Sequence, residues 1–253
     1  MTIIPFGTNG FFPSFNRQTA CFVIPHGKIL IILDAGSGLF RFSEPIGKKL
    51  LEKAEEIHLY LSHYHLDHTF GFYAAFKLFK DKKVFVYARQ EKQIFWEFVK
   101  LKHFPVDYQK VHQNFVWKIL KTGNNPASNY SVQVRTQNHR GEESLAFRFK
   151  LNSEEFAYVT DSEYTREGIS FVKNVPILLQ EHDTLGKNAK ELYNGNHVTT
   201  YGAARIAKEA KAGRLYLIHH NPFLNNAQLN QQLKTAKIVF AQMELSMDKK
   251  EII

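Results

Sequence analysis

The residues with the clearest chemical potential stand at positions 62–68, which read SHYHLDH. Imidazole nitrogens and a carboxylate crowded into one turn of chain are costly to bring together unless a cation lies between them. His63 and His65 are two residues apart, so in an extended segment they project to the same side and can hold one ion. Asp67 and His68, past the turn into a helix, can face a second ion. The motif therefore predicts a metal site with places for two ions.

Each ion needs further ligands from other parts of the chain. Loops at strand ends are where a rigid scaffold presents functional groups, so the candidates are polar residues that close apolar strands. His139 closes VQVRTQNH, Asp161 closes FAYVTD and His219 closes RLYLIH. His197, in GNHVTTYG, lies in a loop before a helix and is a weaker candidate for the site.

The strands and helices expected in the first half of the chain must position the histidine cluster at residues 62–68. Residues 19–24 and 29–34 read as a β-hairpin whose second strand is apolar on both faces and therefore central. Ser43 is the expected N-cap of a helix over 44–56. Alternation over 57–62 predicts a strand that ends at the cluster, and helical stretches follow around 69–79 and 89–101.

The second half has a similar rhythm of strands and helices. We expect strands at 130–139, 144–151, 156–161, 175–180 and 214–220. We expect one helix at 201–213, closed by Gly213, and an amphipathic one at about 225–240. The chain has no repeat of fixed period and no linker rich in Pro, Gly or Ser, so we expect a single α/β domain over residues 1–253.

Composition limits the class of protein. With 44% hydrophobic residues the chain can bury a substantial core, and its net charge of +9 favours anionic ligands. The single cysteine, Cys21, excludes an intrachain disulfide and lies in an alternating strand, where it reads as a small core residue. The start, MTIIPFGTNG, has neither a basic leader nor a long apolar run. We therefore expect a cytoplasmic protein without a membrane span.

Six stretches, taken in order, resemble one known family. They are DAGSG, SHYHLDH, NHRGEESLAFRF, YVTDSE, GNHVTTYGAARIA and RLYLIHHNP. Together they closely resemble the metallo-β-lactamase-fold hydrolases, and among these the phosphodiesterase branch that contains ribonuclease Z and the cyclic-phosphate phosphodiesterases. The resemblance runs from residue 6 to the last helix. It implies a four-layer αββα sandwich with the metals at one edge between the sheets.

The resemblance also implies roles for the residues that match the family's motifs. The first metal would be bound by His63, His65 and His139, the second by Asp67, His68 and His219, with Asp161 bridging the two. Zinc is the expected metal, with manganese or iron as alternatives for such ligands. Asp34 matches an aspartate that supports a ligand histidine. His197, grouped with Asp67 as catalytic, matches a histidine that faces the phosphate, and Glu181 or Asp183 would orient it.

The resemblance leaves the substrate open. Ribonuclease Z proteins usually carry an arm that grips tRNA, inserted between the positions of His139 and Asp161, but only residues 140–160 stand there in this chain. We therefore expect a phosphodiesterase acting on a small or cyclic phosphodiester or on short nucleic acid, and a homodimer is possible by analogy. The alternatives are a lactone or thioester hydrolase, a tRNA 3′-processing endonuclease without the usual arm, and a catalytically silent scaffold.

Overall fold

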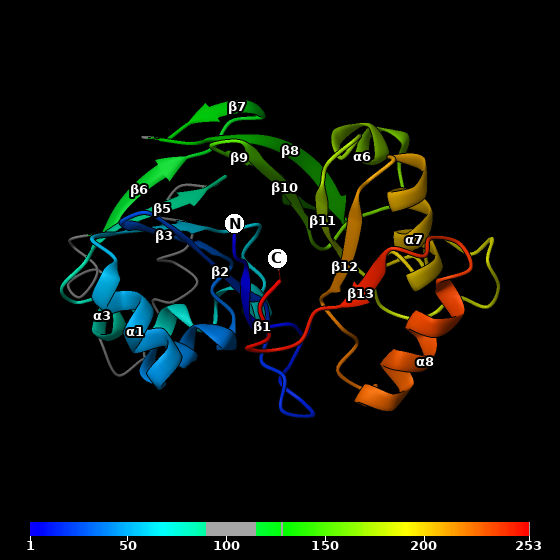
Figure 1. Cartoon of the computed structure of the whole chain (residues 1–253), viewed down its shortest axis with the longest axis horizontal. Coiled ribbons are helices and arrows are strands. Elements are labelled where there is room, and N and C mark those ends of the chain that lie inside the picture. The colour runs from blue at the N-terminus through cyan, green and yellow to red at the C-terminus, as the bar shows by residue number, and fades with distance from the viewer. Residues whose placement is uncertain (90–114, 128, 253) are drawn as a thin grey trace. The chain divides into compact units, whose positions relative to one another are not determined.

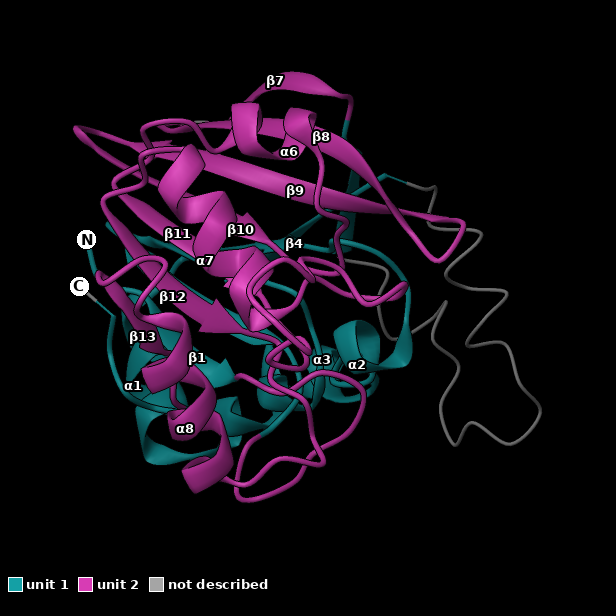
Figure 2. Ribbon diagram, turned by 90° about the vertical axis from the view of Figure 1, so that its right-hand side faces the viewer, with its two compact units in different colours: residues 1–7, 18–120, 248–253 teal, residues 8–17, 121–247 magenta. Residues whose placement is uncertain are grey.

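The computed structural model describes residues 1–89, 115–127 and 129–252, and the chain divides into two compact units (Figure 2). Unit 1 comprises residues 1–7, 18–120 and 248–253, and unit 2 comprises residues 8–17 and 121–247. The helix expected at 89–101 falls almost entirely outside the described residues. The single domain over 1–253 stays a prediction.

Unit 1 is built on a six-stranded mixed sheet with the order β1-β2-β3-β4-β5-β6. Its strands are β1 (Ile4–Gly7), β2 (Cys21–His26), β3 (Ile29–Leu33), β4 (Glu56–Tyr60), β5 (Lys83–Ala88) and β6 (Phe115–Ile119). The predicted hairpin is confirmed, because β2 and β3 pair antiparallel with Val23 opposite Ile32. β3 and β4 then pair in parallel. All five residues of β3 are buried, as expected of a central strand.

Helices pack on one face of this sheet (Figure 1). They are η1, a 3₁₀ helix (Ser37–Ser43), α1 (Pro45–Lys53), α2 (Leu66–Thr69) and α3 (Phe72–Leu78). Phe42 of η1 and Phe72 of α3 join Leu59 and Val86 of the strands in one apolar cluster. Cys21 is fully buried in the same cluster, which confirms its reading as a core residue.

The expected N-cap of α1 is wrong. Ser43 is the last residue of η1, and its hydroxyl donates to the carbonyl of Phe40 at 2.7 Å. Glu44 takes the cap position instead, without a side-chain cap hydrogen bond, and its carboxylate pairs with Arg41 at 3.0 Å. Pro45 at the first helical position sets the start of the helix, because its fixed φ suits that position and its missing N–H leaves no bond unmade.

Unit 2 is built on a seven-stranded mixed sheet with the order β13-β12-β11-β10-β9-β8-β7. Its strands are β7 (Gly123–Pro126), β8 (Ser131–His139), β9 (Glu142–Leu151), β10 (Glu154–Val159), β11 (Ile177–Glu181), β12 (Arg214–Ile218) and β13 (Met243–Leu245). β8, β9 and β10 form tight antiparallel hairpins, and β10 to β13 are parallel. Residues 140–160 contain only turns and the strands β9 and β10, as expected, and they form no arm.

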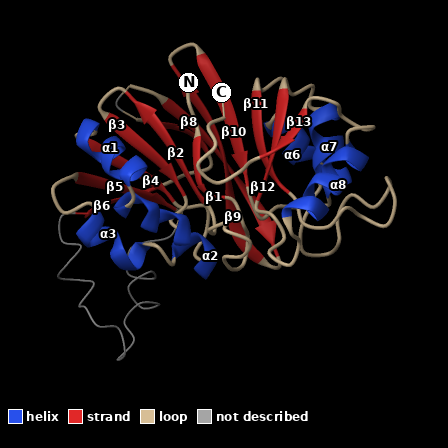
Figure 3. Ribbon diagram, turned by 60° about the horizontal axis from the view of Figure 1, so that its bottom comes forward, coloured by secondary structure: helices blue, strands red, loops and turns tan. Residues whose placement is uncertain are grey.

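Helices α6 (Arg166–Phe171), α7 (Thr200–Glu209) and α8 (Asn226–Ala236) pack on a face of this second sheet (Figure 3). α8 begins with a capping box in which Asn225 and Gln228 each bond the other's backbone N–H. α7 ends earlier than expected, at Glu209, and the left-handed residue after it is Lys211, with φ 54°, rather than Gly213. Among the described residues, no helix combines the length and the apolar character that crossing a membrane requires.

Candidate metal centre

The histidine cluster of unit 1 follows β4 directly, as predicted. β3 and β4 are parallel neighbours, so the loops after both strands meet at one edge of the sheet. The backbone N–H of Asp34, just past β3, donates to the carbonyl of Tyr60, the last residue of β4, at 2.8 Å. Asp34 holds a left-handed backbone with φ 59°, a sparsely populated conformation for a residue other than glycine. Strand pairing therefore brings Asp34 beside residues 62–68.

Asp34 is fully buried against the cluster. One carboxylate oxygen accepts the backbone N–H of Ser62 at 2.7 Å, and the other accepts the Ser62 hydroxyl at 2.9 Å. The second oxygen also contacts Nδ1 of His68 at 2.8 Å, and both side chains are 0% exposed. Because Nδ1 of His68 is engaged by Asp34, Nε2 is the nitrogen directed to Asp67, whose Oδ2 lies 3.4 Å away.

Close packing explains why DAGSG accompanies SHYHLDH. The N–H of Ala35 donates to the carbonyl of His68 at 2.8 Å, and the N–H of Gly71 donates to the carbonyl of Ala35 at 2.7 Å. A Cβ atom added at Gly36 would lie 2.2 Å from the carbonyl oxygen of Asp67. Only glycine allows the two segments to approach so closely, and their bonds fix where α2 ends.

The candidate ligands of unit 2 also stand at strand ends. Asp161 follows β10, Glu181 ends β11 and His219 follows β12, and these three strands are parallel neighbours. His139 ends β8, which runs in the same direction as β10 because each is antiparallel to β9. All four residues therefore lie at the same edge of the second sheet.

The carboxylate of Asp161 stands between two imidazoles. Its Oδ1 lies 3.4 Å from Nε2 of His139, and its Oδ2 lies 3.4 Å from Nε2 of His219. Asp161, Glu181, His197 and His219 each offer a ligand atom within 4.8 Å of the others. Each oxygen of one carboxylate thus faces a different nitrogen, the disposition that a bridging ligand requires.

These separations fit a metal better than hydrogen bonds. A hydrogen bond between a ring nitrogen and a carboxylate is shorter, about 2.7–3.0 Å. A zinc ion bonded at about 2.0–2.1 Å to two atoms of a tetrahedral site holds those atoms roughly 3.3–3.4 Å apart. The 3.4 Å spacing recurs at His68–Asp67, His139–Asp161 and His219–Asp161. His58 and Glu56 are equally far apart, but among the described residues neither belongs to a group of three or more possible ligands, whereas every residue of the first three pairs does. The donor sets of both units therefore suit a divalent metal.

His197 lies close to Asp161, with Nδ1 3.7 Å from Oδ1, but its shortest contact is with Glu181. Nδ1 of His197 is 2.6 Å from Oε2 of Glu181, a fully buried carboxylate whose other oxygen accepts the N–H of Ser162 at 2.5 Å. Burial lowers the pKa of the imidazole, but the negative charge of Glu181, with Asp161 and Asp183 beyond it, outweighs burial and raises that pKa to about 9.

Asp183, the other residue considered for orienting His197, has different partners. Its carboxylate accepts hydrogen bonds from Asn194 at 2.8 Å and from Asn221 at 2.6 Å. Of the two acidic candidates, Glu181 is the one that contacts His197.

Two contributors to the site were not predicted from the sequence. Gly10 lies against the ring of His219, and a Cβ added there would be 2.2 Å from Cε1. His220 anchors the chain beside His219, since its N–H donates to the carbonyl of Thr8 at 2.8 Å and its Nε2–H donates to the carbonyl of Ser246 at 2.7 Å. These bonds hold His219 in a left-handed conformation with φ 57°. No sequence pattern links residues 8–10 to residues 219–220.

A second buried histidine completes this anchor. Nε2 of His182 lies 2.8 Å from Nδ1 of His220, and Nδ1 of His182 lies 2.9 Å from the hydroxyl of Thr200. Burial lowers the pKa of His182 well below its usual value and that of His220 to about 3, so both rings are neutral. The pair therefore has a structural role.

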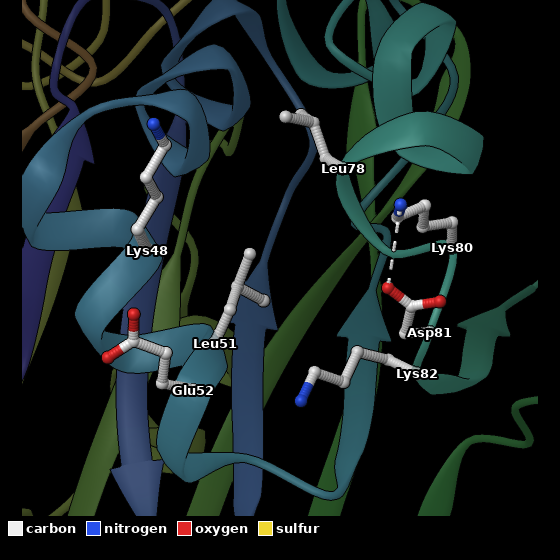
Figure 4. A pocket seen from close by; sticks show the side chains of 7 residues that line it. All are labelled: Lys48, Leu51, Glu52, Leu78, Lys80, Asp81 and Lys82. Atoms are coloured by element: carbon white, nitrogen blue, oxygen red, sulfur yellow. Dashed lines mark ion pairs between the residues drawn. The ribbon is translucent and has the colours of Figure 1, made fainter.

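A hollow in unit 1 is separate from these residues. It lies between α1 and the turn after α3 (Figure 4) and is lined by Lys48, Leu51, Glu52, Leu78, Lys80, Asp81 and Lys82. Lys80 pairs loosely with Asp81, at 3.8 Å, and both side chains are largely exposed. Among the described residues, no imidazole lines this hollow, and Lys80 and Lys82 follow the end of α3, where cations suit the carbonyl end of a helix.

Comparison with known proteins decides the family. The profile of the Beta-lactamase superfamily domain matches residues 30–220. The chain belongs to this superfamily. A curated superfamily relative, the probable metallo-hydrolase YhfI of Bacillus subtilis (strain 168), is 25% identical over 250 residues, which cover 93% of each protein. Ribonuclease Z of Cyanothece sp. is 33% identical over 95 residues, which cover 36% of this chain and only 30% of that enzyme.

Solved structures support the same superfamily fold. The crystal structure of YhfI aligns with a TM-score of 0.78 and 22% identity, covering 99% of this chain and 98% of that chain. A diphosphatase from the PhnP family aligns with a TM-score of 0.74 and 17% identity, covering 99% and 96%. The metallo-β-lactamase fold expected from the sequence is thereby confirmed, and the expectation of a metal-dependent hydrolase is confirmed at the level of the superfamily, which implies divalent metal ions.

Proposed function

We propose that this protein is a dinuclear metal-dependent phosphodiesterase that hydrolyses a small or cyclic phosphodiester or a short nucleic acid. The role of each ligand is the one that the family resemblance implies. The ligands of the first ion would be His63, His65 and His139, those of the second Asp67, His68 and His219, and Asp161 would bridge.

The observation that carries this proposal is the position of the Asp161 carboxylate, with one oxygen 3.4 Å from His139 and the other 3.4 Å from His219. A carboxylate shared in this way is typical of two-metal hydrolases. Zinc suits the mixture of imidazole and carboxylate and the tetrahedral spacing, while manganese and iron accept the same donors.

Divalent ions in such a site supply a nucleophile by lowering the pKa of water and supply positive charge beside the phosphate oxygens. Side chains of this protein would protonate the leaving oxygen and orient the metal ligands. Oε2 of Glu181 accepts the Nδ1–H of His197 at 2.6 Å and raises the pKa of the imidazole to about 9, so the protonated ring would also carry a proton on Nε2 for the leaving oxygen. Asp34 contacts Nδ1 of His68 at 2.8 Å and so fixes the tautomer of that ring. Asp67, which the resemblance counts as catalytic together with His197, would contribute as a ligand of the second ion.

The substrate class follows from the length of the segment between His139 and Asp161. Residues 140–160 form only turns and the strands β9 and β10, so they offer no arm to hold the body of a tRNA. Relatives named ribonuclease Z support chemistry at a phosphodiester, and the neighbour named a diphosphatase of the PhnP family supports chemistry at phosphate. A small diester is therefore favoured over a tRNA precursor.

Metal analysis combined with hydrolysis of bis(p-nitrophenyl) phosphate tests the proposal. Protein prepared without chelators should contain two divalent ions and hydrolyse the diester, and dialysis against a chelator should abolish both. Metal without diesterase activity would instead support a lactone or thioester hydrolase, and protein that binds no metal would support a scaffold. Cleavage of a tRNA precursor faster than of small diesters would overturn the substrate class. Sedimentation checks the homodimer, which stays a prediction.

A further inference from the structure

Three phenylalanine rings form an exposed cluster next to His219, all within unit 2. The ring of Phe12 contacts those of Phe11 and Phe223 edge-on, with centroids 5.3 Å apart in both pairs. Phe11 and Phe223 are 72% and 70% exposed. We call these three residues the aromatic cluster. Large exposed aromatic side chains gathered at one place mark a binding surface more often than isolated ones do.

The cluster is joined directly to the candidate metal centre. The α-carbon of Gly10 lies against the ring of His219. Phe11 is the next residue, so its α-carbon is about 3.8 Å from that of Gly10. On the other side, Phe223 stands four residues after His219. A ligand whose phosphate lies at His219 would therefore have its nearest substituent beside these rings.

The backbone that carries Phe11 and Phe12 is fixed by hydrogen bonds. The N–H of Phe12 donates to the carbonyl of Gly10 at 2.7 Å, which closes a three-residue turn around Phe11. Phe11 has a φ of 57°, an outlier for a bulky side chain, and such strain persists where the surroundings fix it, often at ligand sites.

A polar network beneath the cluster supplies that support. Nδ2 of Asn9 donates to the carbonyl of Phe12 at 3.2 Å, and Oδ1 of Asn9 accepts Nε–H of the buried Arg17 at 2.5 Å. Arg17 also donates to the carbonyl of Leu224 at 2.6 Å, and Ser14 donates to the carbonyl of Pro222 at 2.6 Å. Both loops of the cluster are thus tied to each other.

The size of the cluster identifies the kind of occupant. A phenylalanine ring offers about 200 Å² when fully exposed, so Phe11 and Phe223 together expose roughly 300 Å². A stable protein interface needs about 800 Å² on each partner, which these rings do not supply. One or two planar groups would cover them, and stacking on exposed aromatic faces is how proteins hold nucleobases.

We propose that the aromatic cluster stacks the base of the substrate, so that the substrate class is a nucleotide phosphodiester rather than a phosphodiester of a bare sugar. This inference rests on the proposed function for the position of the phosphate. The net charge of +9 agrees with a ligand that carries phosphate. Phe11 and Phe223 would then set specificity without taking part in the chemical step.

Calorimetric titration of the metal-loaded protein with AMP and with ribose 5-phosphate tests this inference, because the two ligands share the phosphate and differ in the base. AMP should bind more tightly, by roughly 5- to 150-fold, the range that one stacked base provides. Phe11→Ala and Phe223→Ala should each remove most of this preference, and Phe11→Tyr should keep it. Ile238→Ala, which alters a side chain that is 85% exposed elsewhere in unit 2, is the matched control.

Kinetics supply a second readout. For 2′,3′-cyclic AMP the phenylalanine variants should raise KM with little change in kcat, while the rate with the baseless cyclic ribose phosphate should stay the same. Equal binding of AMP and ribose 5-phosphate, or a preference that survives both alanine variants, would overturn the inference. So would a lower sedimentation coefficient of the variants, which would mean that the rings hold a second copy of the chain.

The binding readout needs no turnover, which separates this inference from the proposed function. A base preference without diesterase activity would refute the proposed function and leave the stacking surface supported. Diesterase activity without a base preference would support the proposed function and refute the stacking surface.

Discussion

Replacing Gly10 with alanine should disturb the metal centre although Gly10 has no side chain. The added Cβ would lie 2.2 Å from Cε1, 2.5 Å from Nδ1 and 2.6 Å from Nε2 of His219. Ordinary contact begins near 3.4 Å, so the ring must retreat by about 1.2 Å, the difference between 3.4 and 2.2 Å. Metal bonds tolerate only about 0.2 Å. We therefore expect Gly10→Ala to weaken metal binding by at least about tenfold.

The assay is a titration of the metal-free protein with zinc, monitored by competition with a chromogenic chelator. If residues 8–12 move instead of the ring, the hydrogen bond from Gly10 to the carbonyl of His220, 3.0 Å long, breaks and the free energy of unfolding falls by about 1 kcal/mol. Gly168→Ala is the control, since its nearest atoms lie at 3.2 and 3.3 Å and Gly168 is part of α6. Unchanged zinc affinity and unchanged stability in Gly10→Ala would refute the reasoning.

Four further outcomes are expected. Asp161→Ala should lose bound metal as well as turnover, and two full metal equivalents measured by elemental analysis would exclude its bridging role. His197→Ala should keep the metal and lose about 10²- to 10⁴-fold in diesterase rate, and an unaltered rate would remove it from the mechanism. Asp34→Ala should weaken metal binding by about 10- to 100-fold in the same zinc titration, because His68 loses the partner that fixes its tautomer at 2.8 Å. Burial raises the pKa of the Cys21 thiol well above its usual value, so the thiol should resist Ellman's reagent until the protein is denatured, and rapid labelling of the native protein would contradict its burial.

Most of the strands could be predicted from the sequence because their signals are local. The apolar run of β3 and the alternation of β4 each depend on side chains within one segment. Helix boundaries depended on contacts that the sequence does not display. The helix expected at 69–79 begins later, as α3 at Phe72, and the shorter α2 ends at Thr69, because the N–H of Gly71 bonds to the carbonyl of Ala35 instead of continuing one helix.

The sequence predicts those residues of the candidate site that stand at the ends of strands. His139, Asp161 and His219 each lie where an apolar strand stops, and the sheet of unit 2 brings those ends to one edge. The choice between Glu181 and Asp183 depended on where β11 ends. Glu181 is its last residue, whereas the N–H of Asp183 already bonds to the carbonyl of Val198 in the following loop.

Gly10 could not be found in this way. Its role depends on a segment about 200 residues away along the chain, and a glycine in an N-terminal loop carries no signal of such a contact. The aromatic cluster was hidden for the same reason, because Phe12 and Phe223 meet only in the folded unit.

The two units exchange short pieces of chain, and this has a consequence for anyone who wishes to express them separately. Residues 8–17 belong to unit 2 although they precede almost all of unit 1, and residues 248–253 belong to unit 1 although they follow unit 2. A gene cut at residue 120 would deprive the C-terminal fragment of the loop that supports His219, and the N-terminal fragment of Asp248, whose carboxylate binds Arg41 at 2.8 Å. Separate expression would therefore require residues 248–253 to be linked to the N-terminal fragment and residues 8–17 to the C-terminal fragment.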